Sequence, residues 1–197
     1  MRPREVVVGL SLLGVPSLAL SPLALTACGG GREIEVRDID GRVVRPLGSP
    51  SGRAVVLLFT ATDCPISNRY APEVGRLAGT FGPRGARFFL VYADPAETPE
   101  EIRRHVSDFG YGLPALRDPS HALVRLAGAT VTPEAAVFAG SHLLYRGRID
   151  DWYEDFGRAR AGPTTHELAE ALDAVLAGRR VVTPRTKAIG CFIRGPA

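Results

Sequence analysis

The sequence predicts an α/β protein with a central mixed sheet, helices on both faces and a C-terminal extension. Two continuous apolar runs, Arg53–Thr60 and Ala86–Tyr92, are typical of strands buried on both faces. Amphipathic stretches with helical spacing follow them. The order is strand, helix, strand, helix, then a hairpin and a final helix. Such alternation favours a sheet covered by helices on each side.

The elements follow in order from residue 33. Alternation over Glu33–Val44 around Asp40-Gly41 predicts a hairpin. A helix is expected over Pro65–Phe81, because its large apolar residues recur every three or four positions on one face. That stripe consists of Tyr70, Val74, Leu77 and Phe81. Thr98-Pro99 with Glu101 predicts a capping box that opens a helix ending at Phe109.

The second half of the chain repeats these signals more weakly. A short helix is expected over Ser120–Leu126, and two strands over Ala135–Ala139 and His142–Ile149, joined by a tight turn. Thr164–Glu167 predicts a second capping box. The helix behind it carries the apolar stripe Leu168, Leu172, Val175 and Leu176 and stops before Gly178. Residues 181–197 match no element.

Composition excludes several classes of function. The net charge is +3 without clustered basic residues, and Lys187 is the only lysine, so nucleic-acid binding is not expected. Three cysteines in 197 residues argue against a disulfide-stapled scaffold, and their spacing fits no zinc site. The four histidines are scattered without ligand spacing, so we expect neither a metal nor an organic cofactor.

Residues 1–27 are typical of an export signal. Arg2 and Arg4 precede the apolar run Val6–Leu25. Residues 25–28, Leu-Thr-Ala-Cys, resemble a bacterial lipobox, which implies a lipid on Cys28 and a tether over residues 28–32. An uncleaved anchor and cleavage without lipid remain alternatives. All three interpretations place a domain over 33–180 and a tail over 181–197 outside the cytoplasm. In the lipoprotein interpretation, the protein is anchored to a membrane of a bacterial cell envelope.

Cys64 is the strongest candidate for chemistry. It lies where a buried strand gives way to a helix, near unpaired N–H groups and the positive end of the helix dipole, which stabilise a thiolate. Asp63 opposes this by its charge, or relays protons. The alternative is that Cys64 is a small buried hydrophobic residue. A catalytic role requires a sulfur that solvent can reach.

The segment Cys64–Ser67 with Pro72 resembles the active-site helix of the thioredoxin superfamily, and Thr132-Pro133 resembles its cis-proline. More narrowly, the chain is similar to the peroxiredoxin-like redoxins related to alkyl hydroperoxide reductase and thiol-specific antioxidant proteins. Four segments carry this resemblance: Asp63–Pro65, Thr132–Glu134, Tyr145–Asp151 and Ile189–Ile193. It implies a thioredoxin-like fold.

The departures from these families bear on mechanism. Ser67 stands where thioredoxins carry a resolving cysteine. Ala61 and Leu57 stand where peroxiredoxins carry a threonine and a proline. Two interpretations of Cys191 remain open: the resolving partner of Cys64, or a packing cysteine in a tail that covers the sheet.

The resemblance implies a thiol oxidoreductase whose Cys64 attacks a disulfide of a protein partner or a peroxide. Cys191 or an external thiol would then resolve the product. In this interpretation Thr132 and Pro133 shape the substrate groove, and Ser67 donates a hydrogen bond to the thiolate.

Arg146 is either a cation that lowers the pKa of Cys64 and holds an anionic transition state, or a solvated charge on a strand.

Two non-enzymatic alternatives also stand: a copper carrier with Cys64 and Cys191 as soft ligands, and a redox-inert scaffold.

Overall fold

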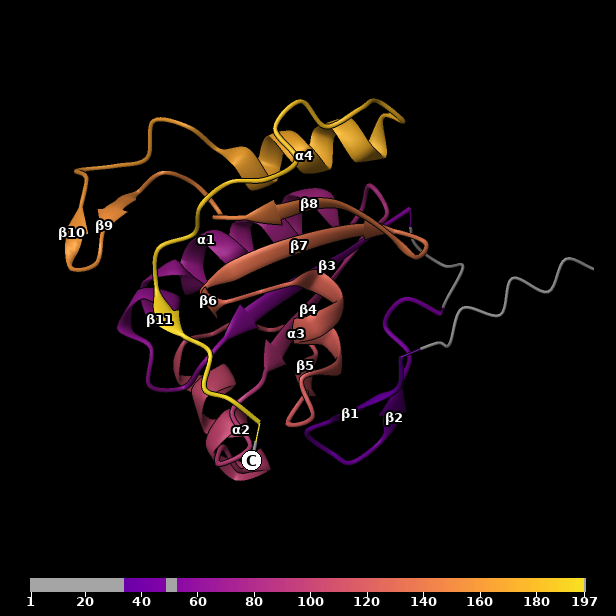
Figure 1. The fold of residues 1–197 in the computed structure, drawn as a ribbon, viewed down its shortest axis with the longest axis vertical. Coiled ribbons are helices and arrows are strands. Elements are labelled where there is room, and N and C mark those ends of the chain that lie inside the picture. The colour runs from indigo at the N-terminus through magenta and orange to yellow at the C-terminus, as the bar shows by residue number, and fades with distance from the viewer. Residues whose placement is uncertain (1–33, 49–52, 197) are drawn as a thin grey trace, which may run out of the picture. The chain divides into compact units, whose positions relative to one another are not determined.

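The computed structural model describes residues 34–48 and 53–196. Within them a seven-stranded sheet runs in the order β2-β1-β5-β4-β3-β7-β8 (Figure 1). Its strands are β1 (Val36–Asp38), β2 (Val43–Val44), β3 (Ala54–Thr60), β4 (Ala86–Tyr92), β5 (Ala115–Arg117), β7 (Glu134–Ala139) and β8 (His142–Gly147). The central strands β3, β4 and β5 are parallel, whereas β7, β8, β1 and β2 are joined antiparallel. The predicted mixed sheet is therefore confirmed.

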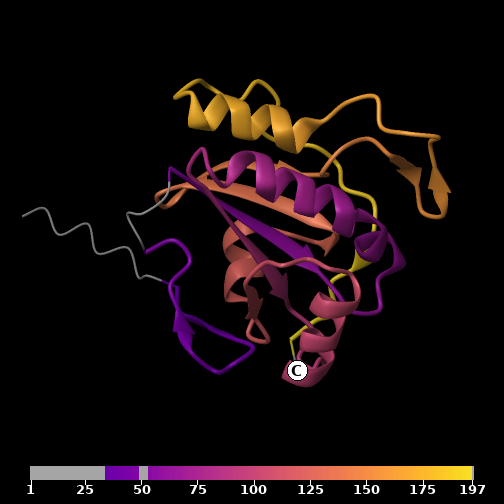
Figure 2. The same cartoon turned by 180° about the vertical axis from the view of Figure 1, so that it is seen from behind.

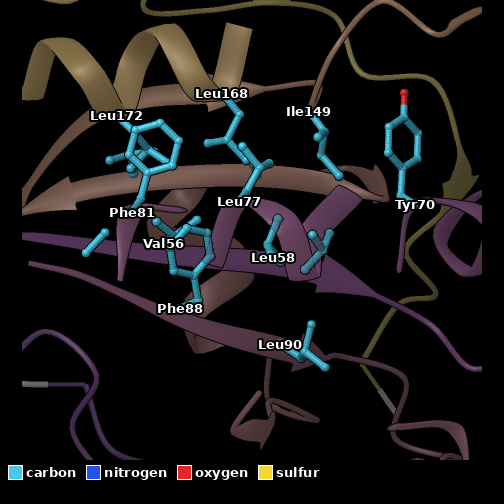
Figure 3. Packing of buried hydrophobic residues seen from close by; sticks show 14 of the residues in the cluster. Val56, Leu58, Tyr70, Leu77, Phe81, Phe88, Leu90, Ile149, Leu168 and Leu172 are labelled. Carbon is cyan, nitrogen blue, oxygen red and sulfur yellow. The ribbon is translucent and has the colours of Figure 1, made fainter. Parts of the chain in front are cut away.

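Helices cover both faces, as the sequence predicts. Alternate residues of β3 point to opposite sides, so Val56 and Leu58 belong to one buried cluster and Leu57 to another. The first cluster is covered by α1 (Pro65–Phe81), α2 (Pro99–Asp108) and α4 (Glu167–Leu176). The second is covered by α3 (Ala122–Ala127). Figure 3 shows the first cluster, with Leu168 and Leu172 of α4 meeting side chains of α1 and the sheet.

The strongest local signals are confirmed. Helix α1 spans the predicted residues, and its stripe Tyr70, Val74, Leu77 and Phe81 is buried. At the start of α2 the capping box is complete. The Glu101 amide donates to Thr98 Oγ1 at 3.2 Å, and the Thr98 amide donates to Glu101 Oε2 at 2.8 Å. The predicted hairpin is β1–β2, with Gly41 at positive φ in its turn.

The second predicted capping box is wrong. Helix α4 begins at Glu167 with His166 as its N-cap, and no side chain caps it. Thr164, the predicted cap, binds buried Asp151 instead. Both its amide and its hydroxyl donate hydrogen bonds to the Asp151 carboxylate. Arg148 binds Glu167, with Nε donating to Oε1 at 2.8 Å. Both residues of the predicted capping box thus bind residues outside the helix instead of each other.

The C-terminal tail, residues 181–196 of the described chain, crosses the molecule as an extended segment (Figures 1 and 2). It first runs beside β8, where the Arg146 amide donates to the Pro184 carbonyl at 3.0 Å and the Thr186 amide donates to the Arg146 carbonyl at 3.1 Å. It then forms β11 (Cys191–Phe192), which pairs antiparallel with β6 (Val131–Thr132). A separate hairpin joins β9 (Tyr153–Asp155) and β10 (Arg158–Ala159).

The predicted signal peptide, the lipidated Cys28 and the whole of the tether over 28–32 lie outside the described residues. Among the helices of the described ranges, none has the length and apolar character needed to cross a bilayer. The division between domain and tail at residue 180 stays a prediction.

Core packing by α4 generates a stability prediction. Leu172 is fully buried, so Leu172→Ala is expected to lower the free energy of unfolding by about 2–5 kcal/mol through lost contacts and a residual cavity. Urea denaturation followed by circular dichroism measures this. Val182→Ala is the control, because Val182 is 94% exposed and its truncation should leave the midpoint unchanged. Equal midpoints for both variants would contradict the packing described for α4.

Candidate active site

Cys64 lies at the junction of β3 and α1, where it is the N-cap residue of the helix. The Ser67 amide donates to Cys64 Sγ at 3.5 Å, and the Cys64 thiol donates to the Thr132 carbonyl at 3.0 Å. The peptide bond between Thr132 and Pro133 is cis, as the resemblance implies. The structure thus brings together Cys64, Ser67, Thr132 and Pro133 from segments far apart in sequence.

The expectation that solvent reaches Cys64 is wrong for this conformation. The residue is 0% exposed. The C-terminal tail contributes to this burial, because β11 pairs with β6 and Cys191 packs against the cluster that contains the cysteine. A segment of the chain's own tail therefore lies over Cys64.

Backbone pairing positions Cys191 beside this covered thiol. Cys191 is opposite Thr132, and Phe192 is opposite Val131. The Ile193 amide extends the pairing by donating to the Thr130 carbonyl at 3.1 Å. A Cβ atom on Gly190 would lie only 2.0 Å from the Thr132 carbonyl oxygen, so this close approach requires glycine. Both cysteines are free thiols, and Cys191 packs against the buried cluster that contains Cys64, close enough to affect the pKa of its thiol.

The site holds Cys64 ready to ionise. Burial alone would raise the pKa of its thiol, but the neighbouring polar groups of Cys191, Ser67 and Thr132 outweigh that effect, and the net pKa is lowered. Among the described residues, the buried hydroxyls of Ser67 and Thr132 have no hydrogen-bond partner within ordinary geometric limits. They are therefore free to turn toward the thiolate.

Cys191 has the opposite character. Burial, its hydrogen bond to Cys64 and the nearby charges of Cys64 and Asp63 raise the pKa of Cys191 to about 12, with Arg194 acting weakly against them. When the pair loses a proton, the negative charge is therefore carried on Cys64 and not on Cys191. Yet Cys191 is the more exposed of the two residues.

Arg194 fastens the tail over the site. Its guanidinium lies 2.6 Å from a carboxylate oxygen of Asp63 and 2.5 Å from one of Asp94. Burial opposes ionisation of Asp94, but the Ala96 amide and Arg194 outweigh it and lower the pKa of that carboxyl. Asp63 is thus engaged with the tail, a contact that sequence reasoning did not foresee. Because Arg194 and Asp63 are exposed, solvent screens their ion pair, which contributes little to stability.

Arg146 does not reach Cys64 in this structure. Its Nε lies 3.3 Å from Glu134 Oε1, and its Nη1 donates to the Gly128 carbonyl. Glu134 in turn accepts from the Thr130 amide at 2.8 Å. This buried carboxylate therefore connects Arg146 to the loop before the cis-proline. No contact of Arg146 supports a direct effect on the pKa of Cys64.

Sequence reasoning also missed Glu97, whose carboxylate is buried behind the active-site loop. The Thr62 amide donates to Glu97 Oε1 at 2.6 Å, while Oε2 is buried without a partner among the described residues. Burial raises the pKa of this carboxyl despite the hydrogen bond from Thr62. The residue lies in the turn before α2, where no local pattern marks it as part of a site.

The fold and the cysteine at its helix start define a thioredoxin-like redoxin. The chain belongs to the AhpC/TSA family, whose family model matches residues 30–147. Among proteins of curated function, none gives a significant match to the chain.

Two solved structures share the whole domain. An uncharacterized conserved protein from Geobacillus kaustophilus is 29% identical with a TM-score of 0.72, over 83% of this chain and 89% of its own. A hypothetical protein from Sinorhizobium meliloti is 27% identical with a TM-score of 0.70, over 81% and 89%. An exposed lipoprotein thioredoxin from Streptococcus pneumoniae, 21% identical with a TM-score of 0.53 over 74% and 98%, shares the fold.

Close packing at Gly190 generates the second prediction. Gly190→Ala is expected to displace β11 and increase the rate at which iodoacetamide alkylates Cys64 by about tenfold or more, because its Cβ cannot fit against the Thr132 carbonyl. Alkylation is followed by mass spectrometry of peptides. Gly195→Ala is the matched control in the same tail, since no atom lies within 4 Å of its added Cβ. Equal Cys64 labelling in both variants would show that β11 does not shield the thiol.

The electrostatic coupling between the thiols of Cys64 and Cys191 generates the third prediction. Cys191→Ala removes a hydrogen bond that lowers the pKa of Cys64, so the Cys64 pKa should rise. Cys64→Ala removes the hydrogen bond and charge that raise the pKa of Cys191, so the Cys191 pKa should fall toward 9.0, its ordinary value. Thiolate absorbance in the ultraviolet against pH measures both. Shifts of the same sign in the two variants are incompatible with a coupled pair.

Proposed function

We propose that this redoxin is a thiol-dependent oxidoreductase that uses Cys64 and Cys191 as an intramolecular redox pair and acts on protein disulfides. The observation that carries the proposal is the pairing of β11 with β6, which sets Cys191 opposite Thr132, the residue whose carbonyl accepts from the Cys64 thiol. The contact takes the place of a second cysteine in α1, where Ser67 stands.

The reaction balances as two thiol–disulfide exchanges. The Cys64 thiolate attacks one sulfur of the substrate disulfide, which forms a mixed disulfide and releases the first substrate thiolate. Cys191 loses its proton and attacks Cys64 Sγ. This step forms the Cys64–Cys191 disulfide and releases the second substrate thiolate. The protein loses two electrons and the one proton of Cys191, and the substrate leaves as two thiolates that carry both electrons and take up protons from Cys191 and from water.

The neighbouring residues have distinct proposed roles. The Ser67 amide and hydroxyl stabilise the thiolate, as do the helix N-terminus and Thr132. Thr132 and Pro133 form the edge along which a substrate segment would lie once β11 leaves it. Asp63 holds the tail through Arg194. Arg146 acts through Glu134, which fixes the loop before Pro133.

A peroxidase is the second candidate, and membership of the AhpC/TSA family favours it. In that reaction the Cys64 thiolate attacks the peroxide, the O–O bond breaks, and Cys64 becomes a sulfenic acid while water or an alcohol leaves. The Cys191 thiol then condenses with it and releases water. Ala61 and Leu57 at the positions of the peroxiredoxin threonine and proline favour disulfide exchange instead.

We also propose that the protein acts at a bacterial membrane surface, anchored by lipid on Cys28. The support is the order of positive start, apolar run and Leu-Thr-Ala-Cys at residues 25–28. Cys28→Ser should then move the protein from the membrane fraction to the soluble extracytoplasmic fraction. An unchanged membrane fraction would favour an uncleaved anchor.

The function is tested by turnover of a chromogenic disulfide. Cys64→Ser should reduce the rate by roughly 10³-fold, because it removes the nucleophile. Cys191→Ser should instead accumulate a mixed disulfide between Cys64 and substrate, visible by mass spectrometry. Val182→Ala, at a fully solvated tail position, is the control with unchanged rate.

Three outcomes would contradict the proposal. Rapid sulfenic acid formation at Cys64 with hydrogen peroxide, without disulfide turnover, would establish the peroxidase instead. Tight stoichiometric uptake of Cu(I) by an enzyme inert to both substrates would favour a copper carrier. Unchanged turnover in Cys64→Ser would remove Cys64 from the chemistry.

A further inference from the structure

Three side chains that can ligate a metal converge beside α1. Glu73 lies within α1, Asp150 follows β8, and His166 is the N-cap residue of α4. One ligand atom from each residue lies within 4.8 Å of the ligand atoms of the other two. Local spacing gives no sign of this set, because its members belong to three separate segments that only the fold brings together.

Asp150 is the buried member of the set, with 4% of its surface exposed. The Tyr70 hydroxyl at 2.5 Å and the Trp152 amide at 2.9 Å both donate to its Oδ1. Across the described ranges no hydrogen bond reaches its Oδ2. A carboxylate oxygen that is left without a partner on so deeply buried a side chain calls for a further positive group. The two donors to Oδ1 meanwhile fix the carboxylate, as outer donors do for metal ligands.

His166 contributes an imidazole that no other contact uses. Its side chain does not cap α4, and its ring nitrogens form no hydrogen bond with any other described residue. The residue is exposed, so its ring is able to turn. A neutral imidazole offers one nitrogen lone pair, which is the commonest metal ligand in proteins.

Glu73 completes the set at the edge of the solvent. Its carboxylate already binds Arg76, with Nε donating at 2.7 Å and Nη2 at 2.6 Å. A carboxylate has about four lone-pair positions, so it is able to bind a guanidinium and a metal at the same time. The charges of Glu73 and Asp150 together exceed the single charge of Arg76, which leaves a net negative site for a cation.

One nitrogen and two oxygen ligands are characteristic of zinc. Zn²⁺ accepts imidazole and carboxylate together, whereas Mg²⁺ and Ca²⁺ prefer oxygen ligands and Cu(I) prefers sulfur. Bonds of about 2.0–2.1 Å place the ligand atoms of a tetrahedral zinc roughly 3.3 Å apart. Rotation of the exposed His166 ring and of the partly exposed Glu73 side chain supplies the remaining approach toward the fixed Asp150.

We infer that Glu73, Asp150 and His166 bind one Zn²⁺ ion, which joins α1 to the segment after β8 and to the start of α4. Water completes the fourth position, since three protein ligands are present. The ion would fasten the end of α4 that has no side-chain cap. No cysteine takes part, so the inference is independent of the chemistry proposed for Cys64.

The test uses the full-length protein with Cys28, Cys64 and Cys191 replaced by serine, which removes every thiol that could bind zinc. Calorimetric titration with zinc chloride should give one ion per chain. His166→Ala should weaken binding by about 100-fold, because it removes a ligand outright. His142→Ala is the matched control, since His142 is also exposed but is not part of the set, and should leave the affinity unchanged.

A second matched pair separates metal binding from the stability of the helices. Glu73 and Glu100 each pair with an arginine three residues further along a helix. Glu73→Gln and Glu100→Gln therefore lose the same kind of helix ion pair, but only Glu73→Gln should weaken zinc binding. Saturating zinc should raise the thermal unfolding midpoint of the parent protein and of the Glu100→Gln variant, and leave that of His166→Ala unchanged.

Two outcomes of the titration would overturn the inference: no stoichiometric uptake of zinc by the folded cysteine-free protein, or equal affinities in His166→Ala and His142→Ala. If the serine replacements prevent folding, Co²⁺ is added to the wild-type protein instead. Visible cobalt bands that disappear in His166→Ala, without a thiolate-to-cobalt charge-transfer band, would support the site. A charge-transfer band that Cys64→Ser abolishes, with no bands sensitive to His166, would place the metal on the cysteines and overturn the inference.

Discussion

The backbone pairing of β11 with β6 is the contact on which the site depends. It sets Cys191 opposite Thr132, next to the cis bond to Pro133, and at the same time covers Cys64. The pairing is possible only because Gly190 has no side chain at the point where the tail meets the Thr132 carbonyl. Arg194 then fastens the far end of the strand to Asp63 and Asp94.

In this arrangement, the cysteine with the lowered pKa is not the cysteine that is more exposed to solvent. Neighbouring polar groups lower the pKa of Cys64, the thiol that is buried, whereas the partly exposed Cys191 has a raised pKa. A dithiol protein in this conformation is therefore protected from adventitious oxidants and metals. In the proposed function, reaction of Cys64 with a substrate disulfide requires the tail to move away from β6.

Much of the fold is predictable because its signals are local. The buried run of β3, the periodic stripe of α1 and the capping box at Thr98 each lie within one stretch of sequence, and the structure confirms them. Prediction fails where a residue distant in sequence competes for the same hydrogen bond. Thr164 was expected to cap α4, but its hydroxyl donates to Asp151. Strands of two residues, such as β6 and β11, have too little length for any periodicity.

The candidate site was also predictable where its signals are local and not where they depend on remote contacts. Cys64 and the cis-proline are marked by their positions at a strand end and before a strand. The burial of Cys64, the engagement of Asp63 with Arg194 and the diversion of Arg146 to Glu134 all arise from contacts between remote segments. Whether Cys191 meets Cys64 depends on the path of residues 181–196, and close packing at Gly147 and Gly190 with backbone hydrogen bonds to Arg146 helps to set that path.

The most direct measurement is the disulfide map of the full-length protein after stoichiometric oxidation by a small disulfide. The account predicts a monomer in which one peptide containing Cys64 is linked to one containing Cys191, with neither thiol open to alkylation. Disulfide-linked dimers, or a product in which both thiols are still alkylated separately, would contradict it.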